Sequence, residues 1–247
     1  PKPFNEIKMK ISEVNTKRKE ELKFQDPKIQ FTDKELWSRF RYFWKQLNPL
    51  QEFKETPEAI NNLKTLIFYF SEDKRFFDCE NLWSSKNTPS FDKGLLIIGT
   101  YGTGKSSYMA ALQLALNGCD KSFMSYHAMG IVDEYEACGS PSDKEVFNKK
   151  YIKGTFNGFK AKAKYFDDLK TERDASNYGK INLFKDILEK RYSNQALTHL
   201  TCNYDPKEEG NMEAGIYEFS AKYGPRVYDR IFSMFNIVEF KGKTFRT

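Results

Sequence analysis

The chain lacks the paired cysteines and clustered histidines on which many small or metal-binding proteins depend. Its 247 residues include four cysteines and two histidines. The cysteines stand far apart and form no C-x-x-C pair: Cys79, Cys119, Cys138 and Cys202. This spacing argues against a disulfide framework or a zinc site, and it suits a reducing cytosol. His199 lies in an apolar segment, where a histidine is more often a core residue than a metal ligand.

Long apolar runs are missing as well. No stretch approaches the roughly 20 apolar residues that a membrane-spanning helix needs. The first residues, PKPFNEIKMK, show no apolar segment of the kind found in secretory signals. We therefore expect a cytoplasmic protein without a membrane partner. Hydrophobic residues make up 39% of the chain, enough for a sizeable core, and the net charge of +6 permits a nucleic-acid partner without establishing one.

One glycine-rich stretch organises the rest of the sequence. An apolar run at 95–98 leads into a turn that fits G-x-x-x-x-G-K-[ST] and then into a helix. Glycines let the backbone curl around a phosphate chain, and the helix presents unpaired N–H groups and a positive dipole end. Lys105 can reach the terminal phosphates and the Ser106 hydroxyl can ligate magnesium, so the stretch predicts a nucleoside triphosphate site. The residues expected around the phosphates are Gly99, Thr100, Tyr101, Gly102, Thr103, Gly104, Lys105, Ser106 and Ser107.

Strand and helix patterns alternate along the chain. The predicted strands are 95–98, 122–129, 163–167, 196–202 and 237–240. The predicted helices are 34–47, 57–72, 105–117, a helix with Val132 and Tyr135 that breaks at 139–142, 143–159, 181–192 and 225–235. Irregular segments are predicted at 73–92 and 170–180. This alternation predicts an α/β fold with a central parallel sheet flanked by helices. We place a boundary near residue 90, between a helical extension over 1–90 that can dock a partner and a nucleotide-binding domain over 91–247.

The helix predicted at 34–47 carries an aromatic stripe. The residues expected to face inward are Trp37, Phe40, Trp44 and Leu47. Such a stripe usually packs in a core, and we expect that here. Tyr42 and Phe43 lie off the stripe, which leaves docking of a partner protein as the alternative.

Two acids close the strand predicted at 163–167. Asp167 is the candidate magnesium ligand, and Asp168 can orient or deprotonate an attacking water. Because parallel strands end at one edge of a sheet, both acids should lie beside the phosphate loop. Asn203 follows the next strand, so its amide can hydrogen-bond the same water or the γ-phosphate. The alternative is that the acids cap a turn and that Asn203 is an ordinary turn residue.

Arginines follow in the last part of the chain. Arg226 and Arg230 are four residues apart on one predicted helix and share a face, and Arg246 follows the final turn. Lone arginines usually lie in solvent. A hydrolytic site whose other cation is Lys105 nevertheless needs further positive charge, and an arginine finger can come from a neighbouring subunit.

The order of these parts resembles the AAA+ ATPases of the bacterial helicase-loader group, of the DnaC, DnaI and IstB type. The matching segments are GTYGTGKSS, YFDDL, LTCN and YGPRVYDRIFSMFNIVEFKGKTFR. In that group a Gly-x-Arg-x-x-x-Asp-Arg helix precedes a short strand and a G-x-S-x-R ending. The corresponding residues here are Gly224, Arg226, Asp229, Arg230, Gly242, Thr244 and Arg246, with Thr in place of Ser. The resemblance covers about residues 93–247.

The resemblance implies a role for each site residue. Lys105 and Ser106 would hold phosphates and Mg2+. Asp167 would be the metal acid and Asp168 the catalytic acid. Asn203 would sense the γ-phosphate. Arg230 would be the finger that reaches the next subunit, and Arg246 would be the second, in-subunit sensor. Many AAA+ proteins have Glu where this chain has Asp168, so slow hydrolysis is plausible. The chain stops soon after Arg246, which implies a minimal C-terminal lid.

In the same family, helices between the second and third strands line a channel for single-stranded DNA. That region is rich in lysine here, and the residues proposed to contact nucleic acid are Lys149, Lys150, Lys153 and Lys160. Aromatic residues stand between the lysines: Phe147, Tyr151, Phe156 and Phe159. Cations for phosphates and rings for bases make a workable single-strand surface. The alternative is an amphipathic helix with core aromatics and solvated lysines.

These observations lead to one hypothesis and several alternatives. The hypothesis is an ATP- and Mg2+-dependent hydrolase that forms a homo-oligomer through its ATP site, assembles on single-stranded DNA and loads or remodels a replicative helicase in DNA replication. A transposition ATPase of the IstB type, which engages a transposase, fits equally well. A metabolite or nucleoside kinase and a non-hydrolysing scaffold are the alternatives from other classes. A GTPase is disfavoured because the sequence has neither a convincing N-K-x-D nor a D-x-x-G after the third strand.

Overall fold

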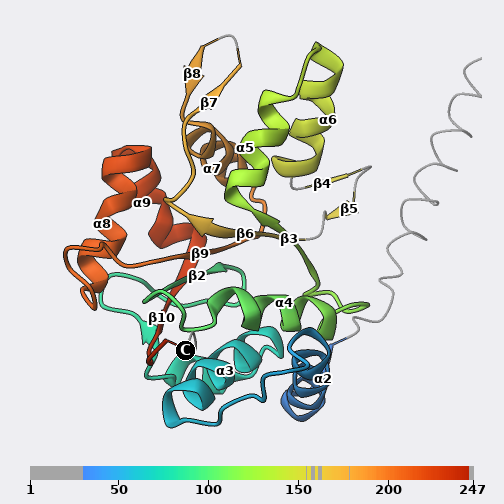
Figure 1. The fold of residues 1–247 in the computed structure, drawn as a ribbon, viewed down its shortest axis with the longest axis vertical. Coiled ribbons are helices and arrows are strands. Elements are labelled where there is room, and N and C mark those ends of the chain that lie inside the picture. Colours follow the sequence, from blue (N-terminus) through green and yellow to red (C-terminus); the bar gives the residue numbers. More distant parts are fainter. Residues whose placement is uncertain (1–29, 154, 157–158, 161–162, 178, 245–247) are drawn as a thin grey trace, which may run out of the picture.

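A computed structural model describes residues 30–153, 155–156, 159–160, 163–177 and 179–244. Its centre is a six-stranded sheet in the order β1-β10-β2-β9-β6-β3 (Figure 1). The strands are β1 (Leu82–Trp83), β2 (Gly94–Gly99), β3 (Phe123–His127), β6 (Ala163–Leu169), β9 (Thr198–Cys202) and β10 (Phe235–Phe240). All neighbouring pairs are parallel except β1, which runs antiparallel to β10. The predicted α/β fold with a central parallel sheet is confirmed.

Helices lie on both sides of this sheet, as Figure 1 shows. On one side are α2 (Asp33–Leu47), α3 (Pro57–Phe70) and α4 (Lys105–Ala115). On the other are α5 (Ala128–Glu136), α6 (Pro141–Tyr151), α7 (Leu183–Ser193), α8 (Met212–Tyr223) and α9 (Pro225–Met234). The shorter elements are η1 (Lys74–Asp78), a pair of strands β4 (Thr155–Phe156) and β5 (Phe159–Lys160), and a second pair β7 (Ala175–Ser176) and β8 (Lys180–Ile181). Within the described part of the chain, no helix has both the length and the apolar composition needed to cross a membrane.

Strand β2 is buried along its whole length because helices cover both of its faces. Leu95 and Ile97 belong to the core on the side of α3 and α4, whereas Leu96 and Ile98 belong to the core on the opposite side. This alternation explains why the strand is a continuous apolar run in the sequence. Helix α8 comes close to the strand at Gly215, where an added Cβ would lie 3.5 Å from the Ile98 Cγ2 atom.

The helices that precede the phosphate loop share its core. Leu36, Phe40 and Trp44 of α2 are buried, and the helix packs against α4. The predicted stripe is therefore right for Phe40 and Trp44, but Leu36 takes the inward place expected for Trp37, and Leu47 is 45% exposed. The buried residues are spaced by four, along one row of the helix. Core packing of this helix is confirmed, while the boundary near residue 90 stays a prediction, and residues 1–29 lie outside the described part.

Four segments differ from their predictions. The segment predicted to be irregular at 73–92 contains η1 and β1, and β1 pairs with β10 as an edge strand of the sheet. Helix α8 has no counterpart among the predicted elements, because Gly215 interrupts its apolar pattern. The helix predicted to reach residue 159 ends at Tyr151, whose carbonyl oxygen accepts a hydrogen bond of 2.7 Å from the buried guanidinium of Arg191. The loop predicted at 170–180 contains β7 and the start of β8, which pair as antiparallel strands.

His199 on β9 lies in the core, as its apolar surroundings predict. Its Nδ1 atom accepts a hydrogen bond of 3.1 Å from the backbone N–H of Leu95. The Tyr69 ring packs edge-on against it, with centroids 5.8 Å apart. Burial, with smaller contributions from the charges of Lys121 and Arg191, lowers the pKa of His199 to about 3. The folded protein therefore holds this imidazole neutral.

This burial predicts a loss of stability in acid. The unfolded chain takes up a proton at an ordinary pKa of about 6.5, whereas the folded chain does so only near pH 3. The unfolded state thus binds more protons in this interval, and the free energy of unfolding falls as the pH drops below about 6.5. When the pH is lowered from about 7.5 to about 5, the protonation of His199 in the unfolded chain should lower the free energy of unfolding by about 2 kcal/mol. Urea unfolding of wild type and His199→Gln at both pH values measures this contribution, and an equal loss in the two proteins would contradict it.

Candidate nucleotide-binding site

The phosphate loop has the predicted strand–loop–helix geometry. Strand β2 ends at Gly99 and helix α4 begins at Lys105. Gly102 and Gly104 have φ angles of 77° and 86°, which a residue with a side chain rarely adopts. At Gly99 an added Cβ would lie 2.5 Å from the backbone oxygen of Phe240. The loop therefore needs these glycines for its curl and for its contact with β10.

Lys105 is a buried cation at the start of α4, with 7% of its surface exposed. Its Nζ atom donates to the backbone oxygens of Gly99, at 2.9 Å, and Thr100, at 2.7 Å. It also donates to Oδ1 of Asn203, 2.9 Å away. Lys105 thus joins the phosphate loop to the residue that follows β9, two features that lie about a hundred residues apart in the sequence.

Asp167 lies opposite the first turn of α4. Its Oδ1 atom accepts hydrogen bonds from Ser106 Oγ at 2.9 Å and from the Tyr165 hydroxyl at 2.5 Å. The Thr201 hydroxyl donates to the same oxygen. The two predicted metal ligands, Ser106 and Asp167, are therefore in direct contact. A hydroxyl and a carboxylate are hard oxygen ligands of the kind that Mg2+ prefers, so the residues present fit this ion.

Asp168 departs from regular strand geometry. Its φ angle is 60°, and the pairing of β6 with β9 shifts register between Phe166 and Leu169. The Asp168 backbone N–H donates to Thr201 Oγ1 at 3.1 Å. The Asn203 amide nitrogen donates to Asp168 Oδ1 at 3.1 Å. Asn203 therefore bonds to both Lys105 and Asp168, and the structure brings together the loop, the acid pair and the amide that the sequence singled out.

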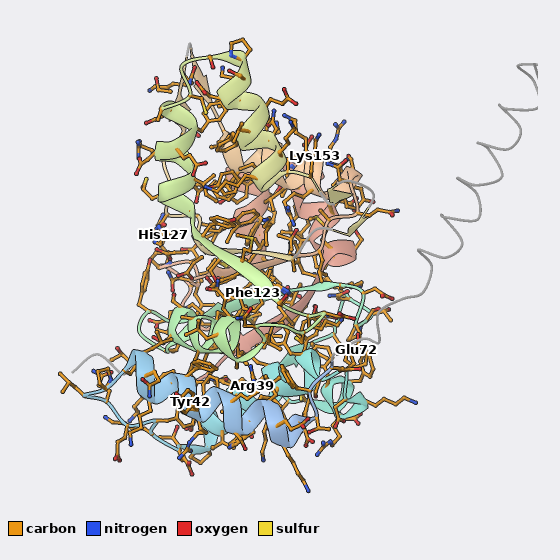
Figure 2. All side chains as sticks on the ribbon, turned by 90° about the vertical axis from the view of Figure 1, so that its right-hand side faces the viewer. Arg39, Tyr42, Glu72, Phe123, His127 and Lys153 are labelled. Atoms are coloured by element: carbon orange, nitrogen blue, oxygen red, sulfur yellow. The ribbon has the colours of Figure 1, made fainter. Side chains whose placement is uncertain are left out.

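His127 is a site residue that the sequence analysis did not propose. It is the last residue of β3 and pairs in register with Asp167. Its Nε2 atom lies 3.9 Å from Asp168 Oδ2. Figure 2 shows His127 at the end of β3 where α5 begins, and Phe123 at the opposite end. The clue in the sequence was its place at the carboxyl end of a parallel strand, which is the edge where sites form.

A pocket of about 980 Å³ joins these residues. Its lining includes Lys105, both acids and Asn203, together with Ser107, Thr201 and His127. Trp44 near the end of α2 and the segment that follows it, at positions 48 and 50–54, line the same pocket. The segment before β2 thus contributes to the same pocket as the phosphate loop, which no local sequence pattern indicated.

The C-terminal segment lies against the phosphate loop. A Cβ added to Gly102 would be 2.1 Å from Thr244 Oγ1. Asn62 of α3 fixes the segment, since its amide donates to the Lys241 carbonyl oxygen at 2.8 Å. Arg246, predicted as the in-subunit sensor, lies outside the described residues.

Arg226 and Arg230 do not line the pocket of their own chain. Arg230 lies over the Tyr192 ring, 4.5 Å from its centroid, and 21% of its side chain is exposed. Arg226 is 71% exposed, and both guanidinium groups lie 3.9 Å from Glu189 Oε2. Their predicted roles therefore require a second subunit and stay predictions.

The lysines proposed for nucleic acid lie on and after α6. Lys149 pairs with Glu145 and Lys150 with Glu134, at 2.8 and 2.7 Å. Lys153 is exposed and appears in Figure 2 on the opposite side of the view from His127. The Lys160 side chain lies outside the described part.

The prediction that aromatic side chains between these lysines stack on bases is wrong for α6. Phe147 and Tyr151 are each only 2% exposed, and their rings pack against each other with centroids 4.7 Å apart. They cannot offer free faces to bases. The alternative stated above, an amphipathic helix with core aromatics, describes this element.

The topology places each part of the site at one edge of the sheet. The phosphate loop follows β2, the acid pair ends β6, and Asn203 follows β9, which lies between those two strands. A P-loop beside strand-end acids at the carboxyl edge of a parallel sheet is the arrangement of a P-loop nucleotide-binding fold.

Comparison with known proteins agrees with this class. No family model matches the chain, and no curated protein matches it. Among solved structures, the chain is similar to the DnaC helicase loader, with a TM-score of 0.54 and 17% identity over 81% of this chain and 99% of that one. It is also similar to DnaI, with a TM-score of 0.47 and 19% identity over 78% and 86% of the two chains. The DnaC likeness shows a shared fold and confirms the resemblance found in the sequence.

Proposed function

We propose that this chain is a Mg2+-dependent ATPase that assembles on single-stranded DNA and loads or remodels a replicative helicase. The observation that carries the proposal is the meeting of Lys105, the acid pair and Asn203 in one pocket. The chain also has the fold of the DnaC helicase loader, which supports a helicase as the proposed partner. The single-stranded DNA and the cytoplasmic location are proposed from the sequence analysis alone.

Each site residue has a part in the proposed hydrolysis. Lys105 holds oxygens of the β- and γ-phosphates. Ser106 and Asp167 hold Mg2+, which when bound offsets the negative charge of the phosphates. Asp168 orients the attacking water and accepts its proton. Asn203 forms hydrogen bonds with both Asp168 and Lys105, and so fixes the position of the carboxylate relative to the ammonium group.

The pocket has room for the nucleoside beyond the phosphates. Trp44, Phe53 and Tyr101 line it, and 55% of the Tyr101 surface is exposed. Aromatic and apolar walls with a few polar groups are typical of small-molecule sites. A nucleoside seated there would lie between the phosphate loop and the segment over 50–54.

Arg230 is the proposed contribution of a neighbouring subunit. Arg230→Ala should leave MgATP binding within about twofold of wild type and lower the hydrolysis rate by about a hundredfold, since an arginine finger stabilises charge only during transfer. Arg173→Ala, which removes an exposed arginine bound to Asp133 and Glu136, is the control and should hydrolyse normally. Mixing Arg230→Ala with Lys105→Ala protein should restore part of the activity, because the second variant supplies Arg230 to intact sites of the first. Normal hydrolysis by Arg230→Ala alone would refute the shared site.

Phosphate release, measured across protein concentration with and without single-stranded DNA, tests the proposal as a whole. A shared site predicts a steep rise of specific activity with concentration and stimulation by DNA. A kinase would instead transfer phosphate to an acceptor and show no such rise. Capture of a replicative helicase, but not of a transposase, would distinguish the helicase-loading role from the transposition role. Failure to bind MgATP would end the proposal.

A further inference from the structure

The backbone just after the acid pair is held in an uncommon conformation. Asp168 and Lys170 have φ angles of 60° and 77°, in the left-handed region that residues with side chains avoid. A regular strand would point the side chains of Asp167 and Asp168 to opposite faces, yet both line the same pocket. Such strain persists only where the surroundings impose it. Contacts outside the strand must therefore hold the segment over 168–172.

Helix α8 supplies those contacts through its last turn. The Tyr223 hydroxyl accepts a hydrogen bond of 3.0 Å from the backbone N–H of Lys170 and donates to Glu172 Oε1 at 2.7 Å. Lys222 Nζ donates to the backbone oxygens of Lys170, at 2.5 Å, and Glu172, at 2.7 Å. Tyr223 is 1% exposed, so its hydrogen bonds are shielded from water. Backbone groups of Lys170 and Glu172 are thus satisfied by side chains of α8, beyond the point where β6 pairs with β9.

Two ion pairs between the segment and α8 reinforce this contact. Lys170 pairs with Glu218 of α8, and Glu172 pairs with Lys222, four residues further along the helix. The side chains of Lys170 and Glu172 are only 9% and 3% exposed, so each needs its partner. The order Lys-Glu on the segment opposite Glu-Lys on the helix fixes the register between them. A shift of either element would place like charges together.

We infer that Glu218, Lys222 and Tyr223 form a clamp that positions the carboxylate of Asp168 for hydrolysis. The inference rests on the proposed ATPase function and adds positioning residues that lie outside the pocket. Released from the clamp, the segment relaxes toward extended backbone and the carboxylate leaves Asn203. Helix α8 also packs against α9, which carries Arg230, so the clamp connects the acid with the helix of the proposed subunit contact (Figure 1).

Tyr223→Phe tests the clamp by removing one hydroxyl. It should lower the kcat for ATP by about tenfold while the KM stays within about twofold, because the phosphate loop is untouched. Tyr69→Phe is the matched control: it removes another buried hydroxyl, which donates to the Lys93 carbonyl oxygen at 2.6 Å and lies far from the acids. The control should lose comparable stability and keep its kcat. Equal kcat in Tyr223→Phe and wild type would overturn the inference.

Charge reversal tests the ion pairs separately from stability. Lys170→Glu and Glu218→Lys should each lower kcat by about tenfold or more, and the double variant should recover most of it. The exposed pair of Lys86 with Glu213, the second residue of α8, is the control, and its charge reversal should leave kcat unchanged. Single variants as impaired as the double one would argue against the clamp.

Amide hydrogen exchange tests the clamp by a measurement that does not depend on ATP hydrolysis. The amide of Lys170 should exchange faster in Tyr223→Phe than in wild type, while amides of β2 remain protected. If wild type bound MgATP but released no phosphate, the proposed ATPase function would be refuted. Faster exchange in the variant would then still show that the clamp holds the segment. If wild type hydrolysed ATP and neither exchange nor kcat changed in the variant, the clamp alone would fail.

Discussion

Lys105→Ala is expected to weaken MgATP binding by about a thousandfold, equivalent to about 4 kcal/mol. Lys105 is the cation that the phosphate loop places beside the phosphates, and charge-assisted hydrogen bonds contribute about 1.5–3 kcal/mol each. Its burial increases the effect, because a charge shielded from water interacts more strongly with the phosphates. Isothermal titration calorimetry with MgATP measures the loss.

A stability control is needed for this variant, because Lys105 also bonds to Asn203. Thermal unfolding shows whether Lys105→Ala remains folded. Lys190→Ala removes an exposed lysine of α7 and should bind MgATP as wild type does. Unchanged affinity in folded Lys105→Ala protein would mean that this lysine only braces the loop, and the nucleotide site would have to lie elsewhere.

Asp168→Asn is expected to lower the rate of hydrolysis by about a thousandfold with little change in MgATP affinity. The amide matches the carboxylate in shape and still accepts from the Asn203 side chain, but it cannot take a proton from water. The bonds of Asp167 to Ser106 and Tyr165 are untouched, so the metal ligands stay in place. Single-turnover phosphate release with saturating protein separates the chemical step from binding.

The outcome also distinguishes the two acids. Asp167→Asn should weaken the dependence of binding on Mg2+, an effect that Asp168→Asn should not show. Asp186→Asn, an exposed acid of α7, is the control for loss of charge. Wild-type hydrolysis by Asp168→Asn would mean that a group other than Asp168 accepts the proton of the attacking water.

The parts that the sequence predicted correctly are those set by local rules. The phosphate loop is recognisable because the glycines, lysine and serine must stand at fixed spacing to surround phosphates. The apolar run of β2 is continuous because both faces are covered. Asp167 and Asn203 could be brought together in advance because the carboxyl ends of parallel strands share one edge.

The rest depended on contacts between distant segments. Helix α8 escaped prediction because Gly215, which permits close packing on β2, weakens its pattern. The clamp on Lys170 joins positions about fifty residues apart and leaves no local pattern. Phe147 and Tyr151 were candidates for base stacking because the spacing of α6 does not reveal which side meets the core. The role of residues 48–54 in the pocket likewise appears only in three dimensions.

The contact between Gly102 and Thr244 has a consequence for how related chains can diverge. Position 102 is constrained twice, by a backbone angle that favours glycine and by the threonine packed against it. A larger residue there would force the final segment away from the loop unless position 244 became smaller. Homologues should therefore show correlated substitutions at these two sites, even though 142 positions separate them in the chain.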